Sequence, residues 1–286
     1  GASLQFSAIP LNLLGKNPKA DYIHTGIWSE KALKEAQRYG EINIVEAGTT
    51  LNGKLAIKDQ SEWNLSQDAA YVHYADNETI GGLQFAGVPE VNAPLVSDLS
   101  SSILSAPIDV SKFGLIYAGA QKNIGPAGLT IVIVRDDLLD QSRSEIPSIL
   151  KYSAQAKNDS MVNTPATYSW YLSGLVFDWL LEQGGIEAIH QVNLEKAKLL
   201  YGYIDASDFY NNPIAEANRS IMNVPFTLAD EALEKLFLKE AEENHLLNLA
   251  GHRSVGGMRA SIYNAVPIEG VQALVNFMDD FARRNG

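Results

Sequence analysis

Two charged side chains at the ends of apolar segments could do chemistry together. Lys122 lies in the turn after the apolar segment 114–120, and Asp98 ends the apolar run that starts at Ala93. Partial burial lowers the pKa of a lysine and makes its amine a usable nucleophile. A lysine and a carboxylate held against a pyridinium nitrogen are the two protein groups that pyridoxal phosphate chemistry requires. Taken singly, an exposed lysine and a capping aspartate are the commoner cases, so the pair alone is a moderate signal.

The elements that must position these residues alternate along the first two-thirds of the chain. Short segments that are apolar nearly throughout are typical of strands buried on both faces of a mainly parallel sheet. The predicted strands are residues 21–26, 42–47, 70–76, 93–99, 114–120 and 129–135. A helix is predicted after the first strand, because Trp28, Ala32, Leu33, Ala36 and Tyr39 recur at helical spacing. This pattern favours an α/β domain with helices on both faces.

The pattern changes after Pro165. Helices are predicted over 168–185, 186–205, 230–245 and 269–284, with strands over 218–226 and 256–266. We therefore expect a small α+β domain at the C-terminus. The predicted division gives a large domain over residues 1–190 and a small domain over residues 191–286.

Charge and composition exclude several classes of function. The net charge is −12 and the pI is about 4.9, which argues against a nucleic-acid partner but permits a local site for small anions. With no cysteine, disulfides, thiolate nucleophiles and Cys-ligated zinc are absent, as fits a cytoplasmic location. No apolar run is long enough for a membrane span. No two histidines have metal-ligand spacing, so no metal site is expected.

Long motifs resemble a known family. The segment 98–110 reads D-L-S-S-S-I-L-S-A-P-I-D-V, and the segment 114–130 reads G-L-I-Y-A-G-A-Q-K-N-I-G-P-A-G-L-T. Further matches are Y-V-H-Y-A-D-N-E-T-I at 71–80, N-T-P-A-T-Y-S-W-Y-L-S-G-L at 163–175, and G-H-R-S-V-G-G-M-R-A-S-I-Y-N-A at 251–265. Together they cover almost the whole chain and resemble the phosphoserine aminotransferases, a branch of the fold-type-I pyridoxal-phosphate enzymes.

The resemblance implies roles around the cofactor ring. Lys122 would be the Schiff-base lysine and would carry the proton between cofactor carbon atoms. Asp98 would pair with the ring nitrogen and keep it protonated. Trp28 would stack on the ring, and Thr79 would hydrogen-bond the ring hydroxyl. Without the motif, Trp28 would be read as a core residue and Thr79 as a turn residue.

The resemblance also implies a shared active site in a homodimer. Ala2, Ser3 and Gln121 would hold the cofactor phosphate, largely through backbone N–H groups near a helix N-terminus. Asn163 and Thr164 would reach the same phosphate from the neighbouring subunit.

Substrate recognition would then depend on cationic side chains. Arg259 matches the family arginine that binds the substrate α-carboxylate, for which a planar guanidinium is suited. His252 and Arg253 match the pair that binds the substrate phosphate across the dimer. The other histidines carry no such context and are interpreted as structural.

The implied activity belongs to serine biosynthesis. The enzyme would exchange an amino group between L-glutamate and 3-phosphohydroxypyruvate, and in bacteria the family also acts on phosphohydroxythreonine in pyridoxine biosynthesis. Family members carry a further N-terminal segment of roughly seventy residues, so we expect this chain to lack that segment and its activity to be impaired. The alternatives are a non-catalytic fragment or another fold-type-I transaminase, of alanine–glyoxylate type.

Overall fold

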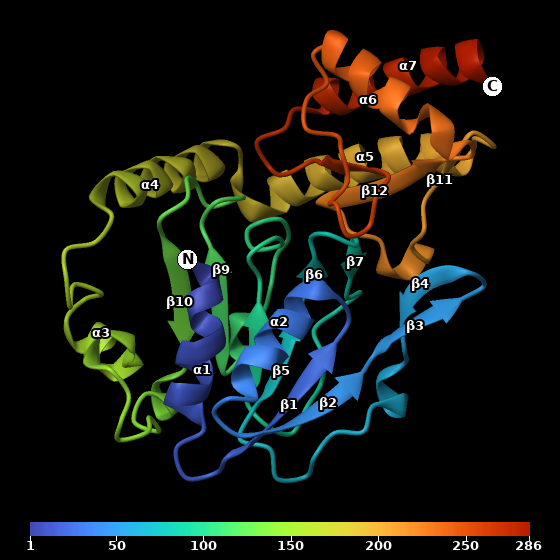
Figure 1. Cartoon of the computed structure of the whole chain (residues 1–286). Helices are drawn as coiled ribbons and strands as arrows, with labels where there is room; N and C mark the ends of the chain where they lie inside the picture. Colours follow the sequence, from blue (N-terminus) through green and yellow to red (C-terminus); the bar gives the residue numbers. More distant parts are fainter.

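The computed structural model describes residues 1–286, and a six-stranded sheet lies at its centre (Figure 1). Its strands lie in the order β10-β9-β8-β5-β1-β2. They are parallel except β10, which pairs antiparallel with β9 at one edge. Their bounds are β1 (Lys19–His24), β2 (Glu41–Glu46), β5 (Val72–Ala75), β8 (Leu95–Asp98), β9 (Leu115–Gly119) and β10 (Thr130–Val134). The predicted mainly parallel α/β domain is confirmed.

Each central strand sends alternate side chains into two different cores. Tyr117 in β9 packs on one face with helices α1 (Gln5–Leu13) and α2 (Ile27–Ala36). Its neighbour Ile116 packs on the other face. Because successive side chains of a strand point to opposite faces, burial on both faces explains why these strands are apolar nearly throughout.

The second face of the sheet differs from the prediction. No α-helix contributes to its core, which instead includes Leu99, Ile103 and Phe113 from the irregular segment between β8 and β9. The expectation of helices on both faces was therefore wrong. The physical reason is that this long connection supplies the apolar side chains which a crossover helix would otherwise bring.

Several short elements in the first part of the chain were not predicted. They are the hairpin β3 (Gly48–Leu51) and β4 (Lys54–Ile57), the hairpin β6 (Asn77–Glu78) and β7 (Leu83–Gln84), and helix α3 (Tyr152–Lys157). Helix α1 was not predicted either, and it contains Pro10. Helix α4 (Thr167–Glu182) agrees with its prediction within a few residues.

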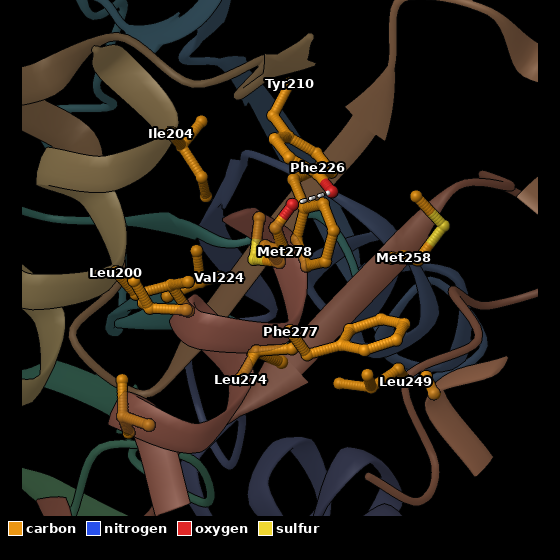
Figure 2. Packing of buried hydrophobic residues seen from close by; sticks show 14 of the residues in the cluster. Leu200, Ile204, Tyr210, Val224, Phe226, Leu249, Met258, Leu274, Phe277 and Met278 are labelled. Carbon is orange, nitrogen blue, oxygen red and sulfur yellow. Dashed lines mark hydrogen bonds between the residues drawn. The ribbon is translucent and has the colours of Figure 1, made fainter. Parts of the chain in front are cut away.

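The C-terminal part is built on a three-stranded antiparallel sheet in the order β11-β12-β13. Its elements are α5 (Gly185–Asp205), β11 (Tyr210–Asn211), β12 (Asn223–Leu228), α6 (Glu234–Glu243), β13 (Met258–Ser261) and α7 (Ile268–Asn285). Figure 2 shows the core between them, where Phe226 from β12 and Phe277 and Met278 from α7 meet, and where the Tyr210 hydroxyl donates to the Met278 carbonyl at 2.9 Å.

Two strands of this part are shorter than predicted, for local reasons. The Ser220 hydroxyl accepts hydrogen bonds from the backbone N–H groups of Met222 and Asn223, so a turn replaces the start of β12. After β13, the carbonyls of Ile262 and Tyr263 bind the Lys196 amine instead of a strand. The predicted domain boundary at residue 190 lies inside α5, and the division into 1–190 and 191–286 stays a prediction.

Candidate active site

A pocket of about 260 Å³ opens at the carboxyl edge of the central sheet. The carboxyl ends of parallel strands meet at one edge, which is where ligands bind in open α/β sheets. Here β8 ends in Asp98, and β9 leads directly into Gln121 and Lys122. The lining residues are Gly1, Ala2, Ser3, Phe6, Trp28, Asn77, Thr79, Asp98, Ser100, Ser101, Gln121, Lys122, Ala127 and Gly128.

Lys122 presents its amine to the pocket from a tight turn. The backbone N–H groups of Lys122 and Gly125 both donate to the Ala120 carbonyl, at 2.7 and 2.8 Å. The Lys122 Nζ donates to the Thr79 hydroxyl at 2.7 Å. Burial lowers the pKa of Lys122 to about 8, against the opposing effect of the Asp98 charge. A fraction of this amine is therefore unprotonated near neutral pH, as nucleophilic chemistry requires.

Asp98 is a buried carboxylate without a cationic partner. Its Oδ1 accepts a hydrogen bond from the Ser100 N–H at 2.9 Å, and no cation forms a salt bridge with it. Burial raises the pKa of Asp98, while hydrogen bonds from Ser100 and the charge of Lys122 oppose that shift. A buried carboxylate is expensive unless it is paired, so the pocket is suited to a ligand with a cationic N–H group.

The first residues of the chain form the opposite wall. Ala2 and Ser3 lie in a single 3-10 turn that leads into α1, and both line the pocket together with Gln121. Trp28, the second residue of α2, also lines the pocket, where its indole Nε1 is buried without a hydrogen-bond partner.

Arg259 reaches the edge of this group from the small sheet. It lies on β13, and its Nη1 donates to the Thr79 carbonyl at 3.2 Å, while its buried Nε has no partner. Thr79 therefore binds Lys122 through its hydroxyl and Arg259 through its carbonyl.

The structure does not bring the remaining predicted residues to this pocket. His252 and Arg253 lie in an exposed turn before β13, where the His252 Nδ1 lies 2.7 Å from the Ser254 hydroxyl. Asn163 and Thr164 are exposed and line a separate hollow beside α4. These positions are those expected of residues that serve a neighbouring subunit, and that role stays a prediction.

The sequence analysis missed several residues of the pocket. Asn77 and Ser101 bind each other, since the Asn77 amide donates to the Ser101 hydroxyl and that hydroxyl donates to the Asn77 carbonyl, each at 2.9 Å. The Ser100 hydroxyl accepts from the Gly119 N–H at 3.0 Å. The only available signal was their place inside the quoted motifs, where polar residues interrupt apolar strands.

A mainly parallel sheet with a lysine and an aspartate at its carboxyl edge, followed by a small antiparallel domain, defines a pyridoxal-phosphate-dependent transferase of fold type I. The family model described as aminotransferase class-V matches residues 1–274. The chain belongs to the class-V aminotransferase family.

Similar proteins and solved structures show which branch of this family the chain resembles. A phosphoserine aminotransferase of Acinetobacter baylyi is 89% identical over 286 residues, covering 100% of this chain and 80% of the relative. The solved phosphoserine aminotransferase of Bacillus circulans subsp. alkalophilus has a TM-score of 0.96 at 46% identity, covering 100% of this chain and 80% of that one. A pyridoxal-phosphate-bound phosphoserine aminotransferase from Trichomonas vaginalis has a TM-score of 0.92 at 43% identity, covering 98% and 80% of the two chains. The predicted resemblance is confirmed, and an alanine–glyoxylate type is not favoured.

The structure contains neither a helix suited to cross a membrane nor a cluster of metal-ligating side chains. None of its helices combines the length and the apolar character that a membrane crossing requires. No group of three or more His, Asp or Glu side chains is arranged to hold a metal ion.

Proposed function

We propose that this chain transfers an amino group between L-glutamate and 3-phosphohydroxypyruvate, with pyridoxal phosphate held in the pocket at the carboxyl edge of the sheet. The observation that carries the proposal is the pair of a partly buried lysine amine with a pKa near 8 and a buried, unpaired carboxylate in one pocket. When bound, the cofactor supplies an electron sink for the carbanion at the substrate α-carbon.

Different residues of this chain would bind different parts of the cofactor. Lys122 would hold the cofactor through its amine, and its Nζ would accept the α-proton of the substrate. Asp98 holds a proton on the ring nitrogen, which its burial and lack of another cation favour. Thr79, whose hydroxyl accepts from the Lys122 amine, would contact the ring hydroxyl, and Trp28, which lines the same pocket, would cover the ring. Backbone N–H groups at Ala2 and Ser3, with Gln121, hold the phosphate.

Substrate binding falls to cations on the small domain. Arg259 binds the α-carboxylate, and its unpartnered Nε is available for that purpose. His252 and Arg253, exposed in their turn, bind the substrate phosphate of a neighbouring subunit's site.

We also propose that the working unit is a dimer joined along helix α4. Only Ser173 and Leu180 of this helix are buried, whereas Tyr168, Tyr171 and Leu181 are 72%, 64% and 73% exposed. An apolar surface of this kind marks an interface. Asn163 and Thr164 lie on the connection that enters α4, so pairing there would carry them toward the partner's cofactor phosphate. The cytoplasmic location and the use of phosphohydroxythreonine stay predictions.

Covalent trapping tests the cofactor site. The purified chain is mixed with pyridoxal phosphate, its visible spectrum is recorded, and the mixture is reduced with borohydride and mapped by peptide mass. We expect a yellow complex and one modified residue, Lys122. Lys196 is a matched internal control, since burial lowers its pKa to about 8 as well, but it lies outside the pocket. Modification spread over several lysines, or none on folded protein, would reject the proposal.

Substrate choice is tested at Arg253. Arg253→Ala removes a predicted phosphate contact and leaves Arg259 in place. We expect kcat/KM for phosphoserine to fall by about 10–100-fold, as for the loss of a charge-assisted hydrogen bond. The value for glutamate, which has no phosphate, should fall less than about threefold. Equal losses for the two substrates would count against a phosphate-binding role.

A further inference from the structure

Glu78 is a fully buried carboxylate beside the pocket to which no role has been assigned. It is 1% exposed and lies on β6, between Asn77 and Thr79, which both line the pocket. Its carboxylate forms no salt bridge, and burial raises its pKa while the hydrogen bonds that it accepts oppose that shift. A buried carboxylate is retained only where its hydrogen bonds offset the cost of desolvation.

Those hydrogen bonds all come from the first turn of α2. The Glu78 Oε2 accepts from the Trp28 N–H at 2.9 Å. Its Oε1 accepts from the Ser29 N–H at 2.9 Å and from the Ser29 hydroxyl at 2.7 Å. The first N–H groups of a helix have no partner within the helix, and a negative charge there complements the helix dipole. Glu78 thus caps α2 from 49 residues away in the chain.

Close approach of the carboxylate depends on Gly26. A Cβ atom at this position would lie 2.7 Å from the Glu78 Cδ, closer than any side chain tolerates. The backbone of Gly26 is extended, with φ of 174°, so space and not conformation requires glycine there. The α2 start and the β6 carboxylate are therefore fitted to each other.

The residue that Glu78 fixes is Trp28, while its neighbour Thr79 binds Lys122 and Arg259. We propose that Glu78 is a positioning residue: it fixes the indole of Trp28 relative to Lys122. This inference rests on the proposed function, because the two side chains would together set the place of the cofactor ring. Glu78 is not itself among the residues that line the pocket, so it acts through Trp28.

A double-mutant cycle on pyridoxal phosphate binding tests this role. Glu78→Gln keeps the shape but removes the charge and turns one acceptor into a donor facing a backbone N–H. We expect the dissociation constant to rise about tenfold, with altered circular dichroism of the bound cofactor. In a Trp28→Ala background the same change should alter it less than twofold, because the group that Glu78 positions is gone. Asp230→Asn is the control for loss of a helix-capping carboxylate. Asp230 also accepts a hydrogen bond from a backbone N–H at the start of a helix, that of Ala232, but it does not line the pocket.

The outcomes separate the two proposals. If the unmodified chain binds no pyridoxal phosphate, the proposed function fails and this inference fails with it. If the unmodified chain binds but Glu78→Gln binds equally well, or weakens binding by the same factor with and without Trp28, only the positioning role is overturned. If Glu78→Gln does not fold, Ser29→Ala takes its place: it removes one contact of the carboxylate, and we expect a two- to fourfold weaker affinity that again disappears in the Trp28→Ala background.

Discussion

The burial of Lys122 has a cost that depends on pH. Burial lowers its pKa from 10.5 to about 8. The unfolded chain binds more protons than the folded chain between these values, so this residue's contribution to stability rises with pH from about 8 to 10.5. Below pH 8 the whole cost is present, roughly 1–3 kcal/mol after allowance for partial exposure.

Lys122→Met should therefore stabilise the cofactor-free protein. At pH 7 we expect the free energy of unfolding to rise by about 1–3 kcal/mol, because an apolar side chain replaces a desolvated charge. The gain should shrink as the pH approaches 10.5. Urea denaturation at pH 7, 8.5 and 10 measures it, and a gain that stays constant over that range would show that the charge is not its source.

His73 gives a pH dependence of the same sign in a lower pH range. It is buried, stacks on Tyr22 with a centroid distance of 4.6 Å, and its Nε2 lies 2.9 Å from the Tyr117 hydroxyl. Burial lowers its pKa from 6.5 to about 3, so its contribution to stability is lost as the pH falls below 6.5. We expect a loss of about 2 kcal/mol between pH 6.5 and 5.

His73→Phe tests that dependence. The variant should be less stable at pH 7 by about 1 kcal/mol, since the Tyr117 hydroxyl loses its partner. Its unfolding free energy should then fall less steeply than that of the unmodified chain between pH 6.5 and 5. If urea titrations gave the same slope of unfolding free energy against pH for the variant and the unmodified chain, His73 would not be the source of the acid sensitivity.

At this scale the sequence predicted Lys122, Asp98 and Thr79, which the structure brings to one pocket, and missed the buried carboxylate beside them. Lys122 and Asp98 could be read from residue type and position at strand ends. Glu78 could not, because its partners Trp28 and Ser29 are about fifty residues away and become neighbours only when α2 packs on the sheet.

At the scale of elements, helix α5 contains a second buried lysine, Lys196. Replacing it with methionine is expected to lower the stability of the chain, whereas the same change at Lys122 is expected to raise it. The Lys196 amine donates to the carbonyls of Ile262, Tyr263 and Val266, at 2.9 to 3.0 Å. It thereby fastens α5 to the connection between β13 and α7. Loss of the amine would leave three inward-facing carbonyls without that partner.

Lys196→Met should destabilise the chain by about 2–4 kcal/mol, because buried acceptors without a partner are costly. Lys198→Met is the matched control: the same change on the same helix at an exposed position, expected to alter stability by less than about 0.5 kcal/mol. Thermal or urea unfolding of the two variants provides the comparison. Equal effects on stability would show that the Lys196 amine does not hold α5 to the connection between β13 and α7.

The sequence predicted regular elements better than irregular ones. Strands such as β9 and helices such as α7 carry their own periodic pattern and were found within a few residues. Helix α1 was missed, since it contains Pro10 and its polar residues Gln5 and Asn12 are buried with the apolar ones, so the sequence shows no polar face. The core segment between β8 and β9 could not be foreseen, because its shape depends on contacts with the sheet.

At the scale of the whole molecule, α4 lies over the ends of β9 and β10 and connects the two parts of the chain (Figure 1). Several of its apolar side chains are exposed, among them Tyr171 and Leu181. Tyr171→Glu combined with Leu181→Glu should weaken self-association at least tenfold, because two desolvated charges would enter the proposed interface. Leu51→Glu, at the exposed β3–β4 hairpin, is the control. Sedimentation equilibrium measures the dimer constant, and an unchanged constant would remove α4 from the interface.

The two parts of the chain are also joined by buried amides, one of which, Asn123, adjoins Lys122. The Asn264 N–H donates to the Asn123 Oδ1 at 3.0 Å, and the Asn193 amide donates to the Ser105 carbonyl at 3.1 Å. Residues 123 and 264 are 141 positions apart. No local sequence pattern predicts a contact between residues so far apart. The sequence therefore predicted two domains but not the contacts between them.

The pocket has one more consequence, which concerns the order of synthesis. Every residue that lines it falls within the first 128 of the chain, whereas Arg259 arrives on the last strand. A nascent chain therefore has all the residues that line this pocket before β13, which carries Arg259, has been made. The two sides of the proposed site would be synthesised at different times, with Lys122 and Asp98 first and Arg259 last.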